Sequence, residues 1–216
     1  MAASAAWTQV ELDSRSCLTL EQVLRAFLAP ISEYHAWAII HQTVQCLLRV
    51  LDTTDMATSK YMAVSSRDIV IHKDGFIHPD TFLLPGLDRK ELTSELNVMG
   101  ELGMVVYEAL DYTMPDDVQR KLGKNLEMML ETMTDVDSGD KGIEDCELGK
   151  DLMRKVVDLC RKNVEVESEA GEHYGGVCRA LVVEALEISS FMAIRLYQNI
   201  SKNINWSIFG AFVQEL

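Results

Sequence analysis

Residues 97–114, NVMGELGMVVYEALDYTM, decide the fold. On a helical wheel the apolar residues of this stretch point in every direction, and a helix that is apolar all round is buried all round. Gly100 and Gly103 each cost about 1 kcal/mol of helix stability against alanine, which is tolerable where a neighbouring backbone must come close. We predict a central helix that is capped by Thr93 or Ser94 and stopped by Pro115. Two glutamates inside the stretch argue against a membrane span.

The remaining chain reads as helices around one short β-hairpin, so the predicted fold class is mainly α. Thr19 and Gln22 form a capping-box pattern at the start of a first helix, and Ser32 opens a second helix with Trp37 in its core face. The stretch 67–80, RDIVIHKDGFIHPD, indicates a hairpin turning at Asp74-Gly75. His72 and His78 flank this turn, but a metal site needs three or four ligands, so we expect surface histidines and no metal.

Further helices are predicted on both sides of an acidic stretch. After Pro115, Asp116 or Asp117 can cap an amphipathic helix with a buried stripe of Leu122, Leu126, Met129, Leu130 and Met133. Residues 134–150, TDVDSGDKGIEDCELGK, predict an acidic loop. Two helices follow, and we expect residues 206–216 to pack back on the body. Residues 1–17 are predicted to be a flexible N-terminal segment, and residues 18–216 a single domain.

Charge and cysteine content limit the functional classes. The formal net charge is −14, from 34 acidic and 20 basic side chains, so binding to nucleic acid or to an anionic membrane is not expected. A basic partner would be attracted instead. The five cysteines form no CxxC pair, and the N-terminus has no basic region or apolar run of a signal peptide, so we expect a reduced intracellular protein. The sequence contains no motif typical of a nucleophile paired with a base, and none typical of a phosphate-binding loop. Neither an enzyme nor a cofactor is therefore expected.

The order of elements resembles the C-terminal lobe of a protein kinase. The kinase pattern LGxxxYExL of the central helix stands here as Leu102, Gly103, Tyr107, Glu108 and Leu110. An overlay without gaps at Gly75 places the catalytic aspartate of kinases on Ala63, their metal-binding asparagine on Asp68 and their second metal-binding aspartate on Thr81. The glycine-rich loop and the lysine of the other lobe are absent, so the resemblance implies a pseudokinase-like lobe without phosphoryl transfer.

A closer resemblance is to the kinase non-catalytic C-lobe domain, KIND, of spire-type actin nucleation factors. Four stretches carry it: LTLEQVLRAFLAPISEYHAWAIIHQ (18–42), VVYEALDY (105–112), HYGGVCRALVVEALE (173–187) and WSIFGAFVQE (206–215). Residues 75–92 align least well, and Gly210 stands where an aromatic residue is expected.

The resemblance implies a protein-interaction domain that binds the basic tail segment of a Cappuccino-type formin through an acidic groove. The expected groove residues follow the central helix, and they are Tyr112, Asp116, Asp117, Glu127, Glu131 and Asp135. Actin would be reached only indirectly, through segments outside this chain, and the expected location is the cytoplasm and cytoskeleton. Two alternatives remain open: a KIND domain of another scaffold or exchange factor that binds a different basic peptide, and an unrecognised enzyme.

Overall fold

The computed structural model describes residues 9–53, 58–85, 89–92, 94–115, 120–134, 144–164 and 169–203, without the side chains of 144–148 and 196–203. The described helices are α1 (Leu20–Phe27), α2 (Glu33–Thr53), α3 (Asp80–Leu83), α4 (Glu95–Leu110), α5 (Lys124–Thr134), α6 (Glu144–Lys162) and α7 (Ala170–Asn203). Two short strands, β1 (Cys17–Thr19) and β2 (Val70–His72), pair antiparallel, with Leu18 opposite Ile71. The fold is therefore mainly α, as predicted.

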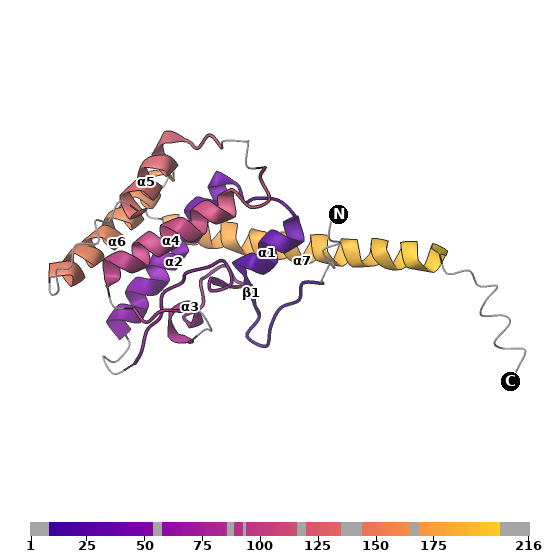
Figure 1. Cartoon of the computed structure of the whole chain (residues 1–216), viewed down its shortest axis with the longest axis horizontal. Helices are drawn as coiled ribbons and strands as arrows, with labels where there is room; N and C mark the ends of the chain where they lie inside the picture. Colours follow the sequence, from indigo (N-terminus) through magenta and orange to yellow (C-terminus); the bar gives the residue numbers. More distant parts are fainter. Residues whose placement is uncertain are drawn as a thin grey trace, which may run out of the picture.

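Helix α4 lies in the middle of the fold and packs on α2, α5 and α6 (Figure 1). Leu102, Val106 and Leu110 are fully or almost fully buried. Ser94 caps the helix, since its side chain accepts a hydrogen bond from the Asn97 backbone N–H. The central helix is thus confirmed, but it ends at Leu110, earlier than predicted. Residues 111–115 form a turn in which Thr113 has a positive φ of 59°.

Other local predictions also hold. Thr19 and Gln22 form the complete capping box of α1. Trp37 on α2 is 6% exposed, and the predicted apolar stripe of α5 faces the core, with Leu122 partly buried beside it. Helix α5 begins at Lys124, later than predicted, and the predicted cap residues Asp116 and Asp117 lie outside the described residues.

The hairpin forms a tight turn with little sheet of its own. The Gly75 backbone N–H donates to the His72 carbonyl, and Gly75 has a φ of 93°, but the returning strand makes only an isolated bridge between Ile71 and Ile77. Strand β2 pairs instead with β1, which was not predicted from the sequence. A Cβ on Gly75 would lie 1.8 Å from the Gly175 carbonyl oxygen, so the turn rests directly on the α7 backbone.

Two stretches of helix were not predicted. Helix α3 lies between Pro79 and Pro85, with Pro79 as its N-cap. Helix α6 begins at Glu144, inside the predicted acidic loop, whereas residues 135–143 lie outside the described residues. The close approach of Gly149 to Glu95 lets α6 pack on α4, because a Cβ at Gly149 would lie 2.4 Å from that of Glu95.

The described part of the N-terminal segment contacts the body. Val10 is 7% exposed, and its backbone N–H donates to the Ser189 hydroxyl at 2.7 Å. Residues 1–8 and 204–216 lie outside the described residues, so a domain boundary at residue 18 and the packing of residues 206–216 remain predictions.

Candidate functional site

One edge of the central helix is open to solvent. Met104 is 49% and Tyr107 48% exposed, and Glu108 beside them is exposed as well. Large apolar side chains at this exposure, one helical turn apart, form a contact surface that the buried face of α4 does not use.

Helix α5 borders this edge. A Cβ at Gly103 would lie 2.9 Å from Thr134 Cγ2, and a Cβ at Gly100 would lie 3.6 Å from the Met133 carbonyl oxygen. Gly103 also lies near the Leu130 carbonyl oxygen, so α5 meets this part of α4 with the strip that holds Leu130, Met133 and Thr134.

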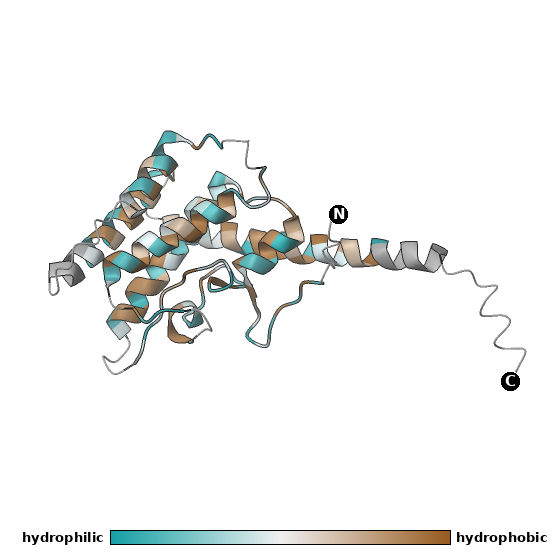
Figure 2. Cartoon of the chain, viewed as in Figure 1, coloured by the Kyte–Doolittle hydropathy of each residue, from teal (hydrophilic) through white to brown (hydrophobic). Residues whose placement is uncertain are grey.

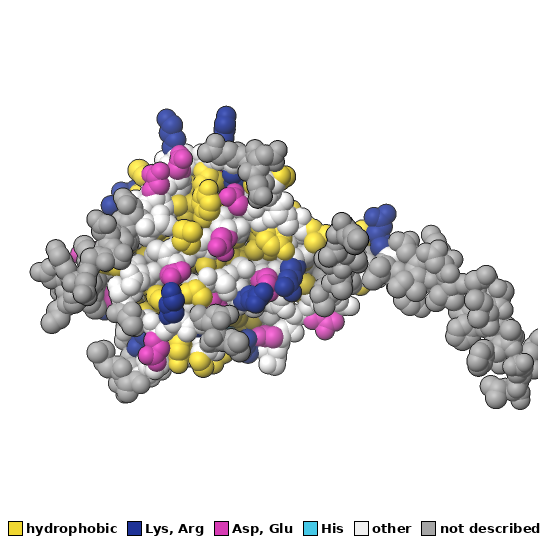
Figure 3. All heavy atoms as spheres, in the orientation of Figure 1, with side chains coloured by type: hydrophobic (Ala, Val, Ile, Leu, Met, Phe, Trp, Pro, Cys, Tyr) yellow, Lys and Arg dark blue, Asp and Glu magenta, His cyan; other side chains and the backbone are white. Residues whose placement is uncertain are grey.

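The exposed carboxylates of α5 follow the same contact line. Glu127 and Glu131 are exposed, and helical spacing places them on the strip that also holds Leu130 and Thr134. Figure 3 shows hydrophobic side chains gathered over α4 and α5 with acidic side chains beside them. We name the set Met104, Tyr107, Glu108, Glu127 and Glu131 the α4–α5 surface.

The structure describes three of the six predicted groove residues. Glu127 and Glu131 lie on the α4–α5 surface, while Tyr112 follows the end of α4 and packs, partly buried, against the core. Asp116, Asp117 and Asp135 lie outside the described residues. A groove that all six share therefore remains a prediction. Met104 and Tyr107 were not predicted as surface residues. The signal that could have found them is that they follow Gly100 and Gly103 along α4: the two glycines allow a close approach of α5, and the next turn of α4 is exposed.

The three positions that overlay kinase catalytic residues hold the fold together. Ala63 is fully buried. The Asp68 carboxylate accepts hydrogen bonds from the Val64 and Ser65 backbone N–H groups and pairs with Arg89 at 2.7 Å. The buried Thr81 hydroxyl accepts a hydrogen bond from the Val70 N–H at 3.1 Å. These side chains are committed to structural contacts.

The four described thiols are equally unsuited to chemistry. Cys17, Cys46, Cys160 and Cys178 are buried and free. Burial raises the pKa of Cys160 and Cys178 to about 12, which keeps both thiols protonated at neutral pH. Among the described residues, no three histidines, cysteines or carboxylates gather in a way that could hold a metal ion.

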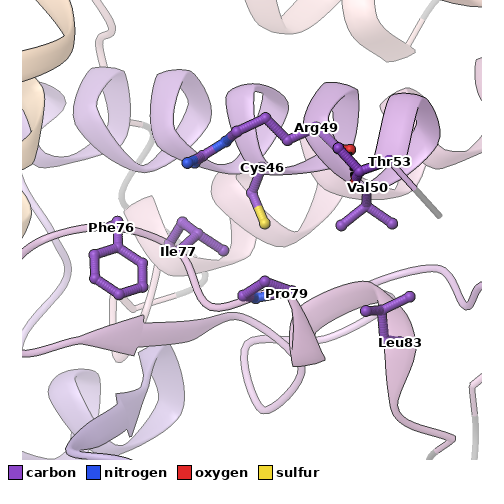
Figure 4. A pocket seen from close by; sticks show the side chains of 8 residues that line it. All are labelled: Cys46, Arg49, Val50, Thr53, Phe76, Ile77, Pro79 and Leu83. Carbon is purple, nitrogen blue, oxygen red and sulfur yellow. Dashed lines mark hydrogen bonds between the residues drawn. The ribbon is translucent and has the colours of Figure 1, made fainter.

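A cavity of about 270 Å³ lies between the second half of α2 and the turn after β2 (Figure 4). Its lining is mostly apolar, with the Arg49 guanidinium as the charged group, and consists of Cys46, Arg49, Val50, Thr53, Phe76, Ile77, Pro79 and Leu83. None of the predicted groove residues lines it. Arg49 Nε donates to the Gln45 carbonyl of its own helix, so no acid–base pair faces this cavity from the described residues that line it.

Comparison with known proteins agrees with this architecture. A model of the kinase non-catalytic C-lobe domain family matches residues 18–193, most of the chain. The chain belongs to this family. Residues 194–216 lie beyond the matched part of the KIND domain.

The curated relatives of this KIND domain are spire proteins. Protein spire homolog 2 of Homo sapiens is 30% identical over 197 residues, which cover 82% of this chain and 26% of that protein. Protein spire homolog 1 of Danio rerio is 27% identical over 198 residues, covering 83% and 26%. Protein spire of Drosophila pseudoobscura pseudoobscura is 28% identical over 116 residues, covering 47% and 11%. The chain thus spans about a quarter or less of the length of these relatives.

The part of the chain that the structure describes gives no indication of a membrane-spanning segment. None of its helices combines the length and the apolar content that a crossing requires.

Proposed function

We propose that this KIND domain is a non-catalytic interaction module of a spire-type actin nucleation factor, and that it binds the basic tail segment of a Cappuccino-type formin. The observation that carries the proposal is the α4–α5 surface. Met104 and Tyr107 are exposed on α4, and Glu127 and Glu131 are exposed on α5, which packs against α4, in a chain whose formal net charge is −14. Apolar contacts supply affinity at the centre of such an interface, and complementary charge selects a basic partner.

The absence of phosphoryl transfer is part of this proposal. Ala63 cannot act as a base, and Asp68 and Thr81 are engaged in hydrogen bonds that shape the loop before β2 and the contact between β2 and α3. ATP with magnesium should leave the melting temperature unchanged, and a rise would favour the alternative of an unrecognised enzyme. The module would act in the cytoplasm on the actin cytoskeleton by recruitment, and other parts of the protein would contact actin.

The test is a titration of the domain with a basic formin tail peptide. We expect the double variant Glu127→Lys and Glu131→Lys to raise Kd by about tenfold or more, because it replaces attraction by repulsion at the contact. The matched control is Glu11→Lys with Asp52→Lys, which makes the same change in net charge at exposed positions outside α4 and α5. Equal losses in the two double variants would show that only overall charge matters and would contradict this location.

The apolar part of the surface gives a second test. Tyr107→Lys should weaken peptide binding more than Glu131→Ala does, because single rim carboxylates contribute only about 0–1 kcal/mol. By the same argument Tyr112→Lys should cost more than Asp135→Ala. A domain that binds basic peptides of other proteins and ignores formin tails would favour the alternative of a different KIND-bearing scaffold.

A further inference from the structure

The outer part of α7 extends beyond the body of the domain. Its inner part is buried through Tyr174, Cys178 and Leu181, and packs on α1 and α2. Farther along, Phe191 is 58% and Ile194 56% exposed. Figure 1 shows this end of α7 running past α1 and away from the other helices, and Figure 2 shows hydrophobic residues along α7 up to the point where the helix is drawn in grey.

The sequence of the outer part of α7 is more apolar than is usual for a helix surrounded by water. Residues 191–200, FMAIRLYQNI, carry one charged residue, Arg195, whose guanidinium lies 5.6 Å from the centre of the Phe191 ring. An apolar helix surface of this kind is normally covered. Phe191 and Ile194 are left uncovered in the described part of the chain.

The chain itself contains a segment that fits this surface. Residues 206–216, WSIFGAFVQEL, lie outside the described residues. At helical spacing, Trp206, Phe209, Val213 and Leu216 share one side, whereas the single charge of the segment is Glu215. The segment therefore carries an apolar stripe, and it follows directly in sequence after the exposed outer part of α7.

The lengths also agree. As a helix, residues 206–216 would be about 17 Å long, and the stretch of α7 from Phe191 to Asn203 is about 20 Å long. Only Ile204 and Asn205 separate the two, which is the length of loop that joins antiparallel helices. So short a loop keeps the local concentration of the segment high and favours it over a partner from solution.

We propose that residues 206–216 fold back as a helix along the outer part of α7 and cover Phe191 and Ile194. The outer end of α7 and this segment then form a helical hairpin that lies mostly beyond residue 193, where the family match ends. The docking is intramolecular, so it does not depend on protein concentration, and it is independent of the α4–α5 surface.

Hydrogen–deuterium exchange on the full chain tests this docking. We expect the amides of residues 206–216 to exchange at least about tenfold more slowly than those of an unstructured peptide. Phe191→Asp with Ile194→Asp should abolish that protection and leave the protection of α4 intact. The reciprocal variant, Trp206→Asp with Phe209→Asp, should speed exchange in residues 191–203. Leu84→Asp changes a comparably exposed apolar residue on another element and should have neither effect.

Several results would overturn the proposal. Exchange of residues 206–216 at the rate of an unstructured peptide would do so directly. Equal loss of protection in the Leu84→Asp control would show that the protection does not depend on Phe191 and Ile194. Protection that grows with protein concentration, together with a dimer mass by light scattering, would assign the outer part of α7 to a second copy of the chain.

Discussion

His41 is a buried ionisable side chain in the core of the domain. It is 2% exposed, and its ring lies 4.9 Å from that of Tyr174 on α7. Burial, with a smaller contribution from Arg161, lowers the pKa of His41 to about 4. The fold therefore holds the neutral imidazole, and unfolding exposes a group that titrates near its ordinary pKa of about 6.5.

This burial predicts acid sensitivity. Because the folded-state pKa is depressed, the stabilisation from neutral His41 is complete above about pH 6.5 and is lost as the pH falls toward 4. Between pH 7.5 and pH 5 we expect the free energy of unfolding to fall by about 2 kcal/mol on this account. Burial also lowers the pKa of His35, which acts in the same direction. Urea titrations should show a shallower pH slope for His41→Phe, and an unchanged slope would contradict the assignment.

The turn glycine gives a second prediction at a single position. Gly75 combines a φ of 93° with an approach to the Gly175 carbonyl that leaves no room for a Cβ. Gly75→Ala should therefore lower the free energy of unfolding by about 3 kcal/mol or more. Gly176→Ala is the control, since nothing lies within 4 Å of its Cβ position on α7, and it should be neutral or stabilising by up to about 1 kcal/mol. Similar losses in the two variants would refute the close approach.

Among the secondary-structure elements, α4 was predictable because its composition alone requires burial on nearly every side. The capping box at Thr19 and the apolar stripe of α5 were also local patterns. The pairing of β1 with β2 was missed because Cys17 and His72 meet only through the tertiary fold. The start of α6 was missed because its first residues are acidic and show no apolar period.

The candidate surface also combines residues that could be predicted from the sequence with residues that could not. Tyr112, Glu127 and Glu131 could be proposed from the acidic sequence that follows α4 and from the family resemblance. The exposure of Met104 and Tyr107 could not be predicted, because it depends on which part of α4 is left uncovered by α5. The point where α5 meets α4 is set by Gly100 and Gly103, and its position requires the packed structure.

For the whole molecule, a formal net charge of −14 predicts salt-dependent association. A basic peptide should be steered toward the domain at low ionic strength, and this attraction is screened over about 10 Å at 0.1 M salt. Stopped-flow measurements should show an association rate that falls by about tenfold between 0.05 and 0.5 M salt, with a much smaller change in dissociation. The Glu127→Lys and Glu131→Lys variant should show a weaker dependence. An association rate that does not change with salt concentration would contradict electrostatic steering.

The hydrogen bond from Val10 to Ser189 joins positions 179 residues apart, and the Gly75 turn likewise rests on α7. Neither contact can form before α7 is present, and α7 is the last described helix to be synthesised. A nascent chain on the ribosome can form α1, α2 and the turn, but it cannot close the domain until α7 has emerged. Until then the apolar faces of α1 and α2 that α7 covers stay open to chaperones and to wrong partners.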